Sequence, residues 1–525
     1  MAAIEIRLAL DGARVAELIG HPALLALRRG RPRTERLRIV YFDTPERRIA
    51  RAGLGLRSRR RGRRWTVSVE SDSPQTPAPG VKAAIEWVST GSAPDPLRLV
   101  ATPWRALFVK ALREGPLGPV CTADVERISF PVDLDGRTFA TLAVDRGYLA
   151  AARGTAGAGR REPVCEVDIG IAAGDPTGLF DLAALLVDEL GCMPEPRSRA
   201  ERGYALADAV VEAPSRARDA SFGPEATARE AATAILAECV RQIRSNAVGF
   251  PAGRDPEWVH QLRIGLRRLR SCLSIFGDLF ASGRVESLAA EIRWALDTLG
   301  AARDLDVFAT STLPRALPDL ALARAGRAGV DWDPDALARR LAARCRLARR
   351  EVDAAVASPR FATLVLDALA LARVPTSDEA RVAAGRESAR AFCARAIERR
   401  ARRLARAGAR LALAGDEERH AVRLAAKKLR YATEFAAPLF PGRRTRESRA
   451  ALARLQETLG EFNDLVVAPR VAAALAGPGS PATATIDAWA RGRAGALAET
   501  IDDAWRHYRS SRPFWPRPRR SDARR

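Results

Sequence analysis

Residues 259–270 read VHQLRIGLRRLR and residues 419–430 read RHAVRLAAKKLR, so the pattern H-x-x-R-x-x-x-[KR]-[KR]-x-R occurs twice. A second pair of motifs follows, LGAARDL at residues 299–305 and LGEFNDL at residues 459–465. In both pairs the two copies stand 160 positions apart. Two different motifs that share one spacing indicate an internal repeat. The alanine- and leucine-rich sequence around them, broken by glycine and proline, predicts a duplicated helical unit.

A helical conformation places most basic residues of the first copy on one side. At about 100° per residue, Arg263, Arg267 and Arg270 fall with His260 within an arc of roughly 80°. The adjoining arc is apolar and is expected to be buried. It contains Val259, Leu262, Leu266 and Leu269. Arg268 falls apart from both groups.

The second copy has a matching basic stripe. It is formed by His420, Arg423, Lys427 and Arg430. Two such stripes that face each other would line a cleft, and the repulsion between their charges favours a multiply charged anion between them. Guanidinium groups suit phosphate oxygens, and a histidine adds a donor whose charge rises as the pH falls. We expect a linear polyanion to fit such a cleft better than one small phosphate. Asp304 and Asp464 are expected to hold the arginines in place or to cap a helix rather than to bind the ligand.

The net charge of +23 is distributed unevenly along the chain. Residues 1–212 contain 31 Lys+Arg and 27 Asp+Glu, a net of +4, and residues 213–525 hold the other 55 and 36, a net of +19. The excess in the helical half favours an anionic partner there. A single run of basic residues on a helix usually forms a solvent-exposed face without a ligand. The recurrence of the run argues against that interpretation here.

The first two hundred residues have the apolar–polar alternation of β-strands. It is visible in IEIRL at 4–8, RWTVSVE at 64–70, FPVDL at 130–134, TFATLAV at 138–144 and CEVDI at 165–169. Asp135-Gly136 between two of these runs predicts a hairpin turn. Helices are expected only near residues 104–113 and 180–190, so this half is predicted to be an antiparallel sheet with few helices.

The doubled histidine–arginine motif, together with Arg303-Asp304 and Asn463-Asp464, resembles the CHAD family (conserved histidine α-helical domain). The resemblance covers about residues 221–510. It implies two helical bundles related by pseudo-symmetry, with a basic surface that binds inorganic polyphosphate. Carried over by position, the polyphosphate-binding residues would be His260, Arg263, Arg267, Arg268, Arg270 and Arg303 in the first repeat and His420, Arg423, Lys427, Lys428, Arg430 and Tyr431 in the second.

CHAD domains often follow a CYTH domain, and about the first 205 residues are similar to one. The matching stretches are YFDTP at 41–45, LGLRSR at 54–59, VDRG at 144–147, EVD at 166–168 and SRAERGY at 198–204. This resemblance implies a closed antiparallel tunnel of eight strands, in which arginines bind triphosphate and carboxylates hold Mg²⁺ or Mn²⁺. By that carry-over the catalytic, triphosphate-binding residues would be Arg57, Arg59, Arg127 and Arg199, and the metal ligands would be Glu5, Glu166 and Asp168.

The sequence departs from the CYTH pattern at inward-facing positions. The opening E-x-E-x-K reads AIEIR at residues 3–7, so the first carboxylate is missing and the lysine is an arginine. Glu70 stands where the family usually has a phosphate-binding lysine, and Gly170 stands where a further carboxylate is common. Two readings stay open: a degenerate tunnel that needs no cofactor and at most binds triphosphate, or an active, metal-dependent inorganic triphosphatase.

These observations predict an α+β tunnel domain at residues 1–208, a linker at 209–220 and an all-α, duplicated helical domain at 221–510. The repeats would run over about 221–380 and 381–510, and a basic disordered tail would occupy 511–525. The expected main partner is inorganic polyphosphate, with triphosphate as a second ligand of the tunnel. Nucleic-acid binding is the less favoured alternative, because no reading helix or RNA-binding signature is recognisable and aromatic residues are few.

The sequence also predicts where the protein resides. Seven widely spaced cysteines without a C-x-x-C pair predict free thiols in a reducing compartment. Neither a signal peptide nor a membrane-spanning helix is expected. We therefore expect a cytoplasmic protein without a membrane partner, and association with polyphosphate granules is left open.

Overall fold

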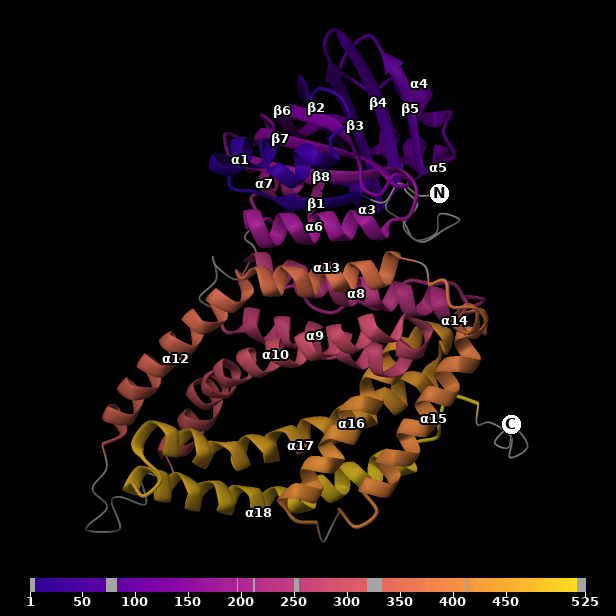
Figure 1. Cartoon of the computed structure of the whole chain (residues 1–525). Helices are drawn as coiled ribbons and strands as arrows, with labels where there is room; N and C mark the ends of the chain where they lie inside the picture. Colours follow the sequence, from indigo (N-terminus) through magenta and orange to yellow (C-terminus); the bar gives the residue numbers. More distant parts are fainter. Residues whose placement is uncertain are drawn as a thin grey trace. The chain divides into compact units, whose positions relative to one another are not determined.

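The computed structural model describes residues 5–71, 83–195, 197–210, 213–249, 255–318, 333–374, 376–411 and 414–516. They form two compact units (Figure 1). The sheet unit comprises residues 1–214 and 357–375, and the helical unit comprises residues 215–356 and 376–525. The predicted fold class, an antiparallel sheet followed by an all-helical region, is confirmed. The disordered tail predicted over 511–525 is wrong for residues 511–516, because Trp515 is buried and its Nε1 donates to the Glu398 carboxylate at 2.9 Å. From residue 517 on, the predicted tail lies outside the described residues.

The sheet unit is built on one antiparallel sheet with the strand order β5-β4-β3-β2-β6-β7-β8-β1-β9. The strands are β1 Glu5–Ala9, β2 Arg33–Asp43, β3 Leu54–Arg61, β4 Arg64–Ser71, β5 Ala83–Ser89, β6 Gly118–Asp133, β7 Phe139–Ala151, β8 Arg161–Ala173 and β9 Met193–Pro194. The expected tunnel had eight strands and was closed. Within the described ranges the sheet has nine strands, and its end strands β5 and β9 are not paired with each other.

Alternation along the strands sorts the side chains onto two faces of the sheet. Apolar residues such as Ile6 and Leu8 of β1 lie in a buried core on one face. Charged residues lie on the other face, where the strand register pairs Arg7 with Asp168. The register also aligns Asp145 of β7 with Arg127 of β6 and with Glu166 of β8. The fold therefore brings together most of the charged residues that the sequence singled out in this half.

Short helices accompany this sheet. They are α1 Val15–Ile19, α2 Pro22–Leu27, α3 Arg48–Arg51, α4 Pro96–Val100, α5 Arg105–Glu114, α6 Thr177–Leu190 and α7 Arg199–Ala207. Helices α5 and α6 confirm the two helices expected in this half, but the expectation that there would be only two was wrong, because the structure has five further short helices here. Helix α7 begins with a capping box, in which the Ser198 hydroxyl accepts from the Glu201 amide and the Glu201 carboxylate accepts from the Ser198 amide.

Helix α13 (Pro359–Arg373) joins the sheet unit from a distant part of the sequence. Ser358 caps its start by accepting a hydrogen bond from the Phe361 amide. Ala362, Leu366 and Ala370 lie in the same hydrophobic core as α6 and β1. The helical domain predicted over 221–510 therefore includes a segment that is compact with the sheet.

The helical unit contains α8 Ala228–Gly249, α9 Glu257–Phe276, α10 Ser282–Val307, α12 Pro334–Val356, α14 Glu379–Gly385, α15 Ala389–Ala407, α16 Asp416–Ala436, α17 Arg443–Ala476 and α18 Pro481–Ser510. Helices α8, α9 and α10 recur in order as α15, α16 and α17, which places the two copies of the basic motif on α9 and α16. Thr227 and Ser388, just before α8 and α15, form an antiparallel bridge. The Ala228 amide donates to the Glu387 carbonyl at 2.7 Å, and the Ala389 amide donates to the Ala226 carbonyl at 2.9 Å.

No single helix among the described residues is long and apolar enough to cross a membrane. Helices α12 and α13 meet the length and composition criteria only together, as a pair bent by 53°. All seven cysteines are free, as the sequence predicts.

We expect Leu366→Ala on α13 to destabilise the sheet unit by roughly 2–5 kcal/mol, because Leu366 is only 1% exposed and its truncation leaves a cavity in the core. The measurement is hydrogen–deuterium exchange of the β8 and α6 amides under native conditions. Leu347→Ala on α12, at a position that is 49% exposed, is the matched control and should stay within about 0.5 kcal/mol of the unaltered protein. Equal exchange in the two variants would show that α13 is not part of this core.

Candidate anion-binding sites

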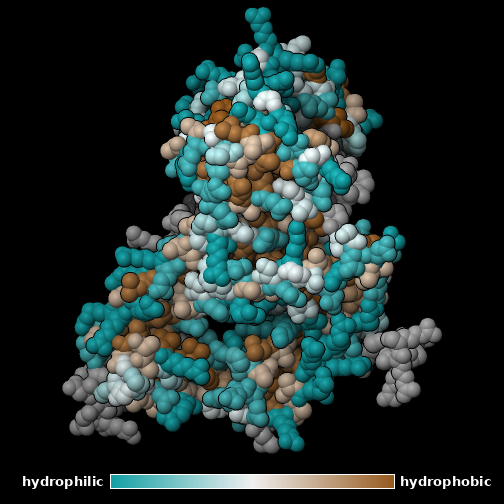
Figure 2. All heavy atoms as spheres, viewed as in Figure 1, coloured by the Kyte–Doolittle hydropathy of each residue, from teal (hydrophilic) through white to brown (hydrophobic). Residues whose placement is uncertain are grey.

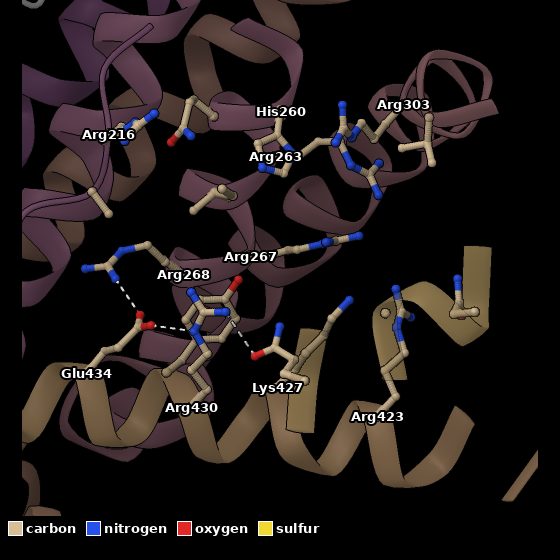
Figure 3. A pocket seen from close by; sticks show the side chains of 18 of the residues that line it. Arg216, His260, Arg263, Arg267, Arg268, Arg303, Arg423, Lys427, Arg430 and Glu434 are labelled. Carbon is tan, nitrogen blue, oxygen red and sulfur yellow. Dashed lines mark hydrogen bonds and ion pairs between the residues drawn. The ribbon is translucent and has the colours of Figure 1, made fainter. Parts of the chain in front are cut away.

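A cavity of about 540 Å³ lies in the helical unit between α9 and α10 of the first repeat and α16 and α17 of the second. Figure 2 shows this unit hollowed between these helices, and Figure 3 shows the side chains that line the hollow. Its cationic lining consists of Arg216, Arg218, Arg263, Arg267, Arg268, Arg303, Arg423, Lys427, Arg430 and Arg449. Among the described residues, four carboxylates line it, those of Asp219, Asp304, Glu434 and Asp464. The surplus of cations over carboxylates gives the cavity a positive lining, which favours an anionic ligand.

Nine of the twelve predicted polyphosphate-binding residues line this cavity. They are His260, Arg263, Arg267, Arg268, Arg303, Arg423, Lys427, Arg430 and Tyr431. The other three, Arg270, His420 and Lys428, are exposed and are not lining residues. The lining part of α9 runs from His260 to Arg268. Arg268, which the helical projection set apart, therefore belongs to the cavity, and Arg270 lies beyond its edge.

Arg263 is nearly buried in the cavity wall, at 8% exposure. Its Nη1 donates a hydrogen bond of 2.9 Å to the Leu296 carbonyl on α10. Gly300 of the LGAARDL motif makes this approach feasible, since a Cβ at that position would lie 3.0 Å from Nη1 of Arg263. Burial, together with the neighbouring charge of Arg267, lowers the pKa of Arg263 to about 10.

Lys427 and Arg423 of α16 lie in the field of Arg267 on α9. Burial is the main cause that lowers the pKa of Lys427 to about 7, and the positive charges of Arg267 and Arg423 act in the same direction. Burial and Arg267 likewise lower the pKa of Arg423. The Nε of Arg423 is buried and has no hydrogen-bond partner in the described part of the chain. Holding these groups charged costs free energy, which an anion placed among them would offset.

The two motif histidines differ in environment. Burial, followed by the charge of Arg303, lowers the pKa of His260 below its ordinary value and so disfavours its charged form. His420 is exposed, and its Nδ1 lies 3.3 Å from Oδ1 of Asn463, a lining residue. The pseudo-symmetry of the sequence is therefore not matched at this position of the cavity.

Glu434 links the two repeats at one side of the cavity. Its carboxylate accepts from Nη1 of Arg268 on α9 at 3.0 Å and from Nε of Arg430 on α16 at 2.7 Å. The Arg268 guanidinium also lies over the Phe435 ring, at 5.1 Å from its centroid. Tyr431 stacks on the same Phe435, with 6.4 Å between the ring centroids. Figure 3 shows the Glu434 contacts between the two helices.

Asp304 and Asp464 occupy equivalent positions in the repeats and both line the cavity. Each lies within its helix, α10 or α17, and neither caps a helix. Burial raises the pKa of Asp464 although Arg423 and Arg303 oppose this shift. Of the two roles expected from the sequence, electrostatic contact with the arginines is the one compatible with these positions.

Sequence reasoning missed several polar residues of the lining, among them Arg216, Arg218, Arg449 and Gln456. The first two belong to the predicted linker, where no periodicity marks a face. The other two lie on α17, upstream of the LGEFNDL motif. No sequence signal marks Gln456, because the hydrogen bond of 3.2 Å that its side chain accepts from Arg430 depends on the packing of α16 against α17.

In the sheet unit, the predicted metal ligands and arginines form a dense network of ion pairs. Nε of Arg7 lies 2.8 Å from Asp168 and 3.5 Å from Glu166. Arg199 pairs with Glu166 at 2.7 Å, with Asp168 at 3.2 Å and also with Asp145. Burial by itself raises the pKa of Asp168, but Arg7 and Arg199 outweigh it and hold this pKa below its ordinary value. Arginines therefore neutralise these carboxylates.

The other predicted triphosphate-binding arginines also have carboxylate partners. Arg127 bonds both oxygens of Asp145, at 2.7 and 2.6 Å, and lies 3.2 Å from Asp168. Arg59 lies 3.2 Å from Glu86. Arg57 donates to the Ser68 hydroxyl at 3.1 Å and forms an ion pair with Glu70. Glu70, which stands where the CYTH pattern has a lysine, thus neutralises an arginine expected to bind phosphate.

The residues expected to bind Mg²⁺ or Mn²⁺ do not fit a metal ion. Glu166 and Asp168 are each engaged by more than one arginine, and Glu5 is exposed and lies 3.6 Å from Arg7. Within the described ranges, no group of three or more Asp, Glu, His or Cys side chains is arranged to hold a metal. A cation would have to displace guanidinium groups that already lie within ion-pairing distance.

The fold and these sites define a protein with an antiparallel CYTH-like sheet and a duplicated, basic helical region. A model of the CHAD domain matches residues 234–473, and a model of the CYTH domain matches residues 1–204. The chain therefore belongs to the CHAD family, with a CYTH domain preceding the CHAD domain.

Solved structures resemble both halves. The CHAD domain of the plant Ricinus communis is 31% identical, with 57% of this chain and 98% of that chain covered and a TM-score of 0.48. PptA from Streptomyces chartreusis is 22% identical over 54% of this chain and all of its own, with a TM-score of 0.41. A putative adenylyl cyclase from Hippeastrum, described as having a dominant triphosphatase activity, is 18% identical over 37% of this chain and 89% of its own, with a TM-score of 0.22.

We expect Lys427 to titrate near neutral pH in the free protein, because burial and neighbouring arginines disfavour its charged form. With a pKa of about 7, the amine is charged in acid and largely neutral about two pH units above it. The measurement is an NMR titration of the lysine ¹³Cε signals, which are few because the chain has only four lysines.

Lys427→Arg assigns the signal in this titration. Lys428→Arg, at the neighbouring exposed position, is the matched control and should leave the signal unchanged. If all lysine signals titrate near the ordinary value of 10.5, the cavity is more hydrated than these contacts imply.

Proposed function

We propose that the CHAD domain binds inorganic polyphosphate in the cavity between its two repeats. The observation that carries this proposal is the surplus of ten cationic side chains over four carboxylates around one cavity, with cations supplied by both α9 and α16. The buried and unpartnered Nε of Arg423 adds a donor for which the described residues provide no acceptor. A chain of phosphates would supply acceptors at several of these positions together.

The lowered pKa values support an anion with several charges. Arg263, Arg423 and Lys427 are each less easily charged than in water, because burial and like charges oppose their protonated forms. One monovalent anion would relieve only part of this repulsion. Polyphosphate carries a negative charge on every unit, and its flexibility lets successive units contact both repeats.

Nucleic acid is the less favoured polyanion. Tyr431 is the aromatic residue among those that line the cavity, and its ring already stacks on Phe435. Binding of single-stranded nucleic acid commonly uses free aromatic faces on which bases stack. Competition between RNA and long-chain polyphosphate at equal phosphate concentration distinguishes the two ligands, and we expect polyphosphate to remain bound.

For the CYTH domain we infer that metal-dependent hydrolysis of triphosphate is absent. The support is the pairing of Glu166 and Asp168 with arginines, together with the neutralisation of Arg57 by Glu70. Triphosphate binding would then require these internal ion pairs to open. Binding of polyphosphate would be compatible with the association with polyphosphate granules that the sequence left open.

We expect Arg267→Ala with Arg423→Ala to weaken binding of long-chain polyphosphate at least about tenfold, a loss of ~1.4 kcal/mol. These two arginines face each other from the two repeats, and Arg267 is preferred to Arg263 because Arg263 also bonds the Leu296 carbonyl. The measurement is the dissociation constant of the full chain, obtained at several salt concentrations.

The matched control for this pair is Arg284→Ala with Arg446→Ala, which removes two exposed charges outside the cavity, one from each repeat. It should change affinity little. An equal loss in both double variants would show that binding depends on diffuse charge.

We also expect no saturable binding of Mn²⁺ and no release of phosphate from triphosphate with Mg²⁺ or Mn²⁺, because guanidinium groups occupy the carboxylates that would bind the metal. Calorimetry with Mn²⁺ and a phosphate-release assay check this expectation. Metal-dependent turnover that Arg57→Ala abolishes would establish the triphosphatase alternative instead.

A further inference from the structure

The segment Ser215–Asp219, which begins the helical unit directly after residue 214, is fixed to that unit by hydrogen bonds. The Ser215 amide donates to Oδ1 of Asn246 at 2.9 Å, and Nδ2 of Asn246 donates back to the Ser215 carbonyl at 2.9 Å. Arg241 donates to the Ser215 hydroxyl at 3.0 Å and to the Arg216 carbonyl at 3.2 Å. Asn246 is fully buried in α8, so the side chain that holds Ser215 is itself fixed by packing.

A second attachment ties the same segment to the cavity. Nη2 of Arg268 donates to the Arg218 carbonyl at 3.3 Å, while Nη1 of the same guanidinium bonds Glu434 of the other repeat. The segment is therefore joined to the residues that link α9 to α16. Backbone groups make most of these contacts, which leaves the side chains of Arg216 and Arg218 available for other partners.

Both arginine side chains line the cavity. Each residue is exposed, and no ion pair joins either one to a carboxylate in the described part of the chain. Figure 3 shows Arg216 at one edge of the pocket, with Arg303 and Arg423 at the opposite side. Residues 215–219 also lie between the two stretches that match the CYTH and CHAD models. They add two cations, Arg216 and Arg218, and one carboxylate, Asp219, to a cavity that the helices of both repeats also line.

We propose that Ser215–Asp219 forms a third wall of the cavity and that a phosphate chain longer than the cavity leaves it across Arg216 and Arg218. This inference rests on the proposed polyphosphate binding and extends it to chain length. The cations of α9 and α16 are sufficient to neutralise a short oligophosphate within the cavity. A longer chain must continue over the rim, where Arg216 and Arg218 bind its next phosphates.

The test compares long-chain polyphosphate with triphosphate, using the full chain. We expect Arg216→Ala with Arg218→Ala to weaken binding of long-chain polyphosphate about tenfold and to leave triphosphate binding within about twofold. The slope of log affinity against log salt for the long chain should become less steep by about 1.4, at roughly 0.7 for each phosphate that is no longer neutralised. Arg216→Lys with Arg218→Lys should restore most of the slope, because it keeps the charges.

Arg284→Ala with Arg446→Ala is again the matched control, since it removes the same number of exposed charges away from the cavity. The proposed path across Arg216 and Arg218 is wrong if Arg216→Ala with Arg218→Ala weakens binding of long-chain polyphosphate no more than this control does. It is also wrong if the double variant loses as much affinity for triphosphate as for the long chain. If the unaltered protein binds polyphosphate and the linker variant binds it equally well, this inference fails alone. If the unaltered protein does not bind polyphosphate, the proposed function fails and this inference fails with it.

Discussion

Repulsion between like charges, held at close range by helix packing, is the constraint on which the helical unit depends. The duplicated helices α9 and α16 place Arg267 beside Arg423 and Lys427, and α10 encloses Arg263. Burial removes the water that would otherwise screen these charges. Apolar residues on the adjoining faces of the helices are buried and hold the helices together, which keeps the attached cations near one another. An anion among these cations would relieve the repulsion that the packing imposes.

In the CYTH domain, carboxylates of the protein itself relieve the repulsion between arginines. Its charged face is also rich in arginine, but Glu166, Asp168 and Asp145 lie among the guanidinium groups and neutralise them. Among the described residues, this face needs no external anion and has no free carboxylate set for a metal. Two arginine-rich sites in one chain thus have different electrostatic requirements, and net charge alone would not separate them. Where carboxylates of the protein pair with the arginines, the positive charge is neutralised internally. Where such carboxylates are few, the positive charge favours an external anion.

Much of the helical site could be predicted from the sequence, because the shared spacing of 160 residues identifies α9 and α16 as equivalent and helical periodicity selects a face. The helical projection failed at Arg270, because it does not say how far along α9 the cavity extends. It also failed at Arg268, because it does not show that Glu434 and the Arg218 carbonyl lie on that side of the helix. It also could not anticipate the asymmetry between His260 and His420. Arg216 and Arg218 could not be predicted as lining residues. Their segment is positioned by hydrogen bonds from Asn246, Arg241 and Arg268, and these hydrogen bonds join residues that are far apart in the sequence.

For the sheet unit, alternation predicted strands and a charged face, and the departure from the family pattern at Glu70 marked a position that holds an internal ion pair. That Glu70 pairs with Arg57 could not be read from the strands alone, because it requires the register of β3 against β4. The sequence also could not predict that α13 belongs to the sheet unit, because its apolar face resembles that of any core helix.

The most direct test of the account is a crystal structure of the full chain with long-chain inorganic polyphosphate. We expect continuous phosphate density between α9 and α16, within hydrogen-bonding distance of arginines from both repeats. Phosphate density confined to outer helix faces, with the cavity filled by solvent, would contradict it.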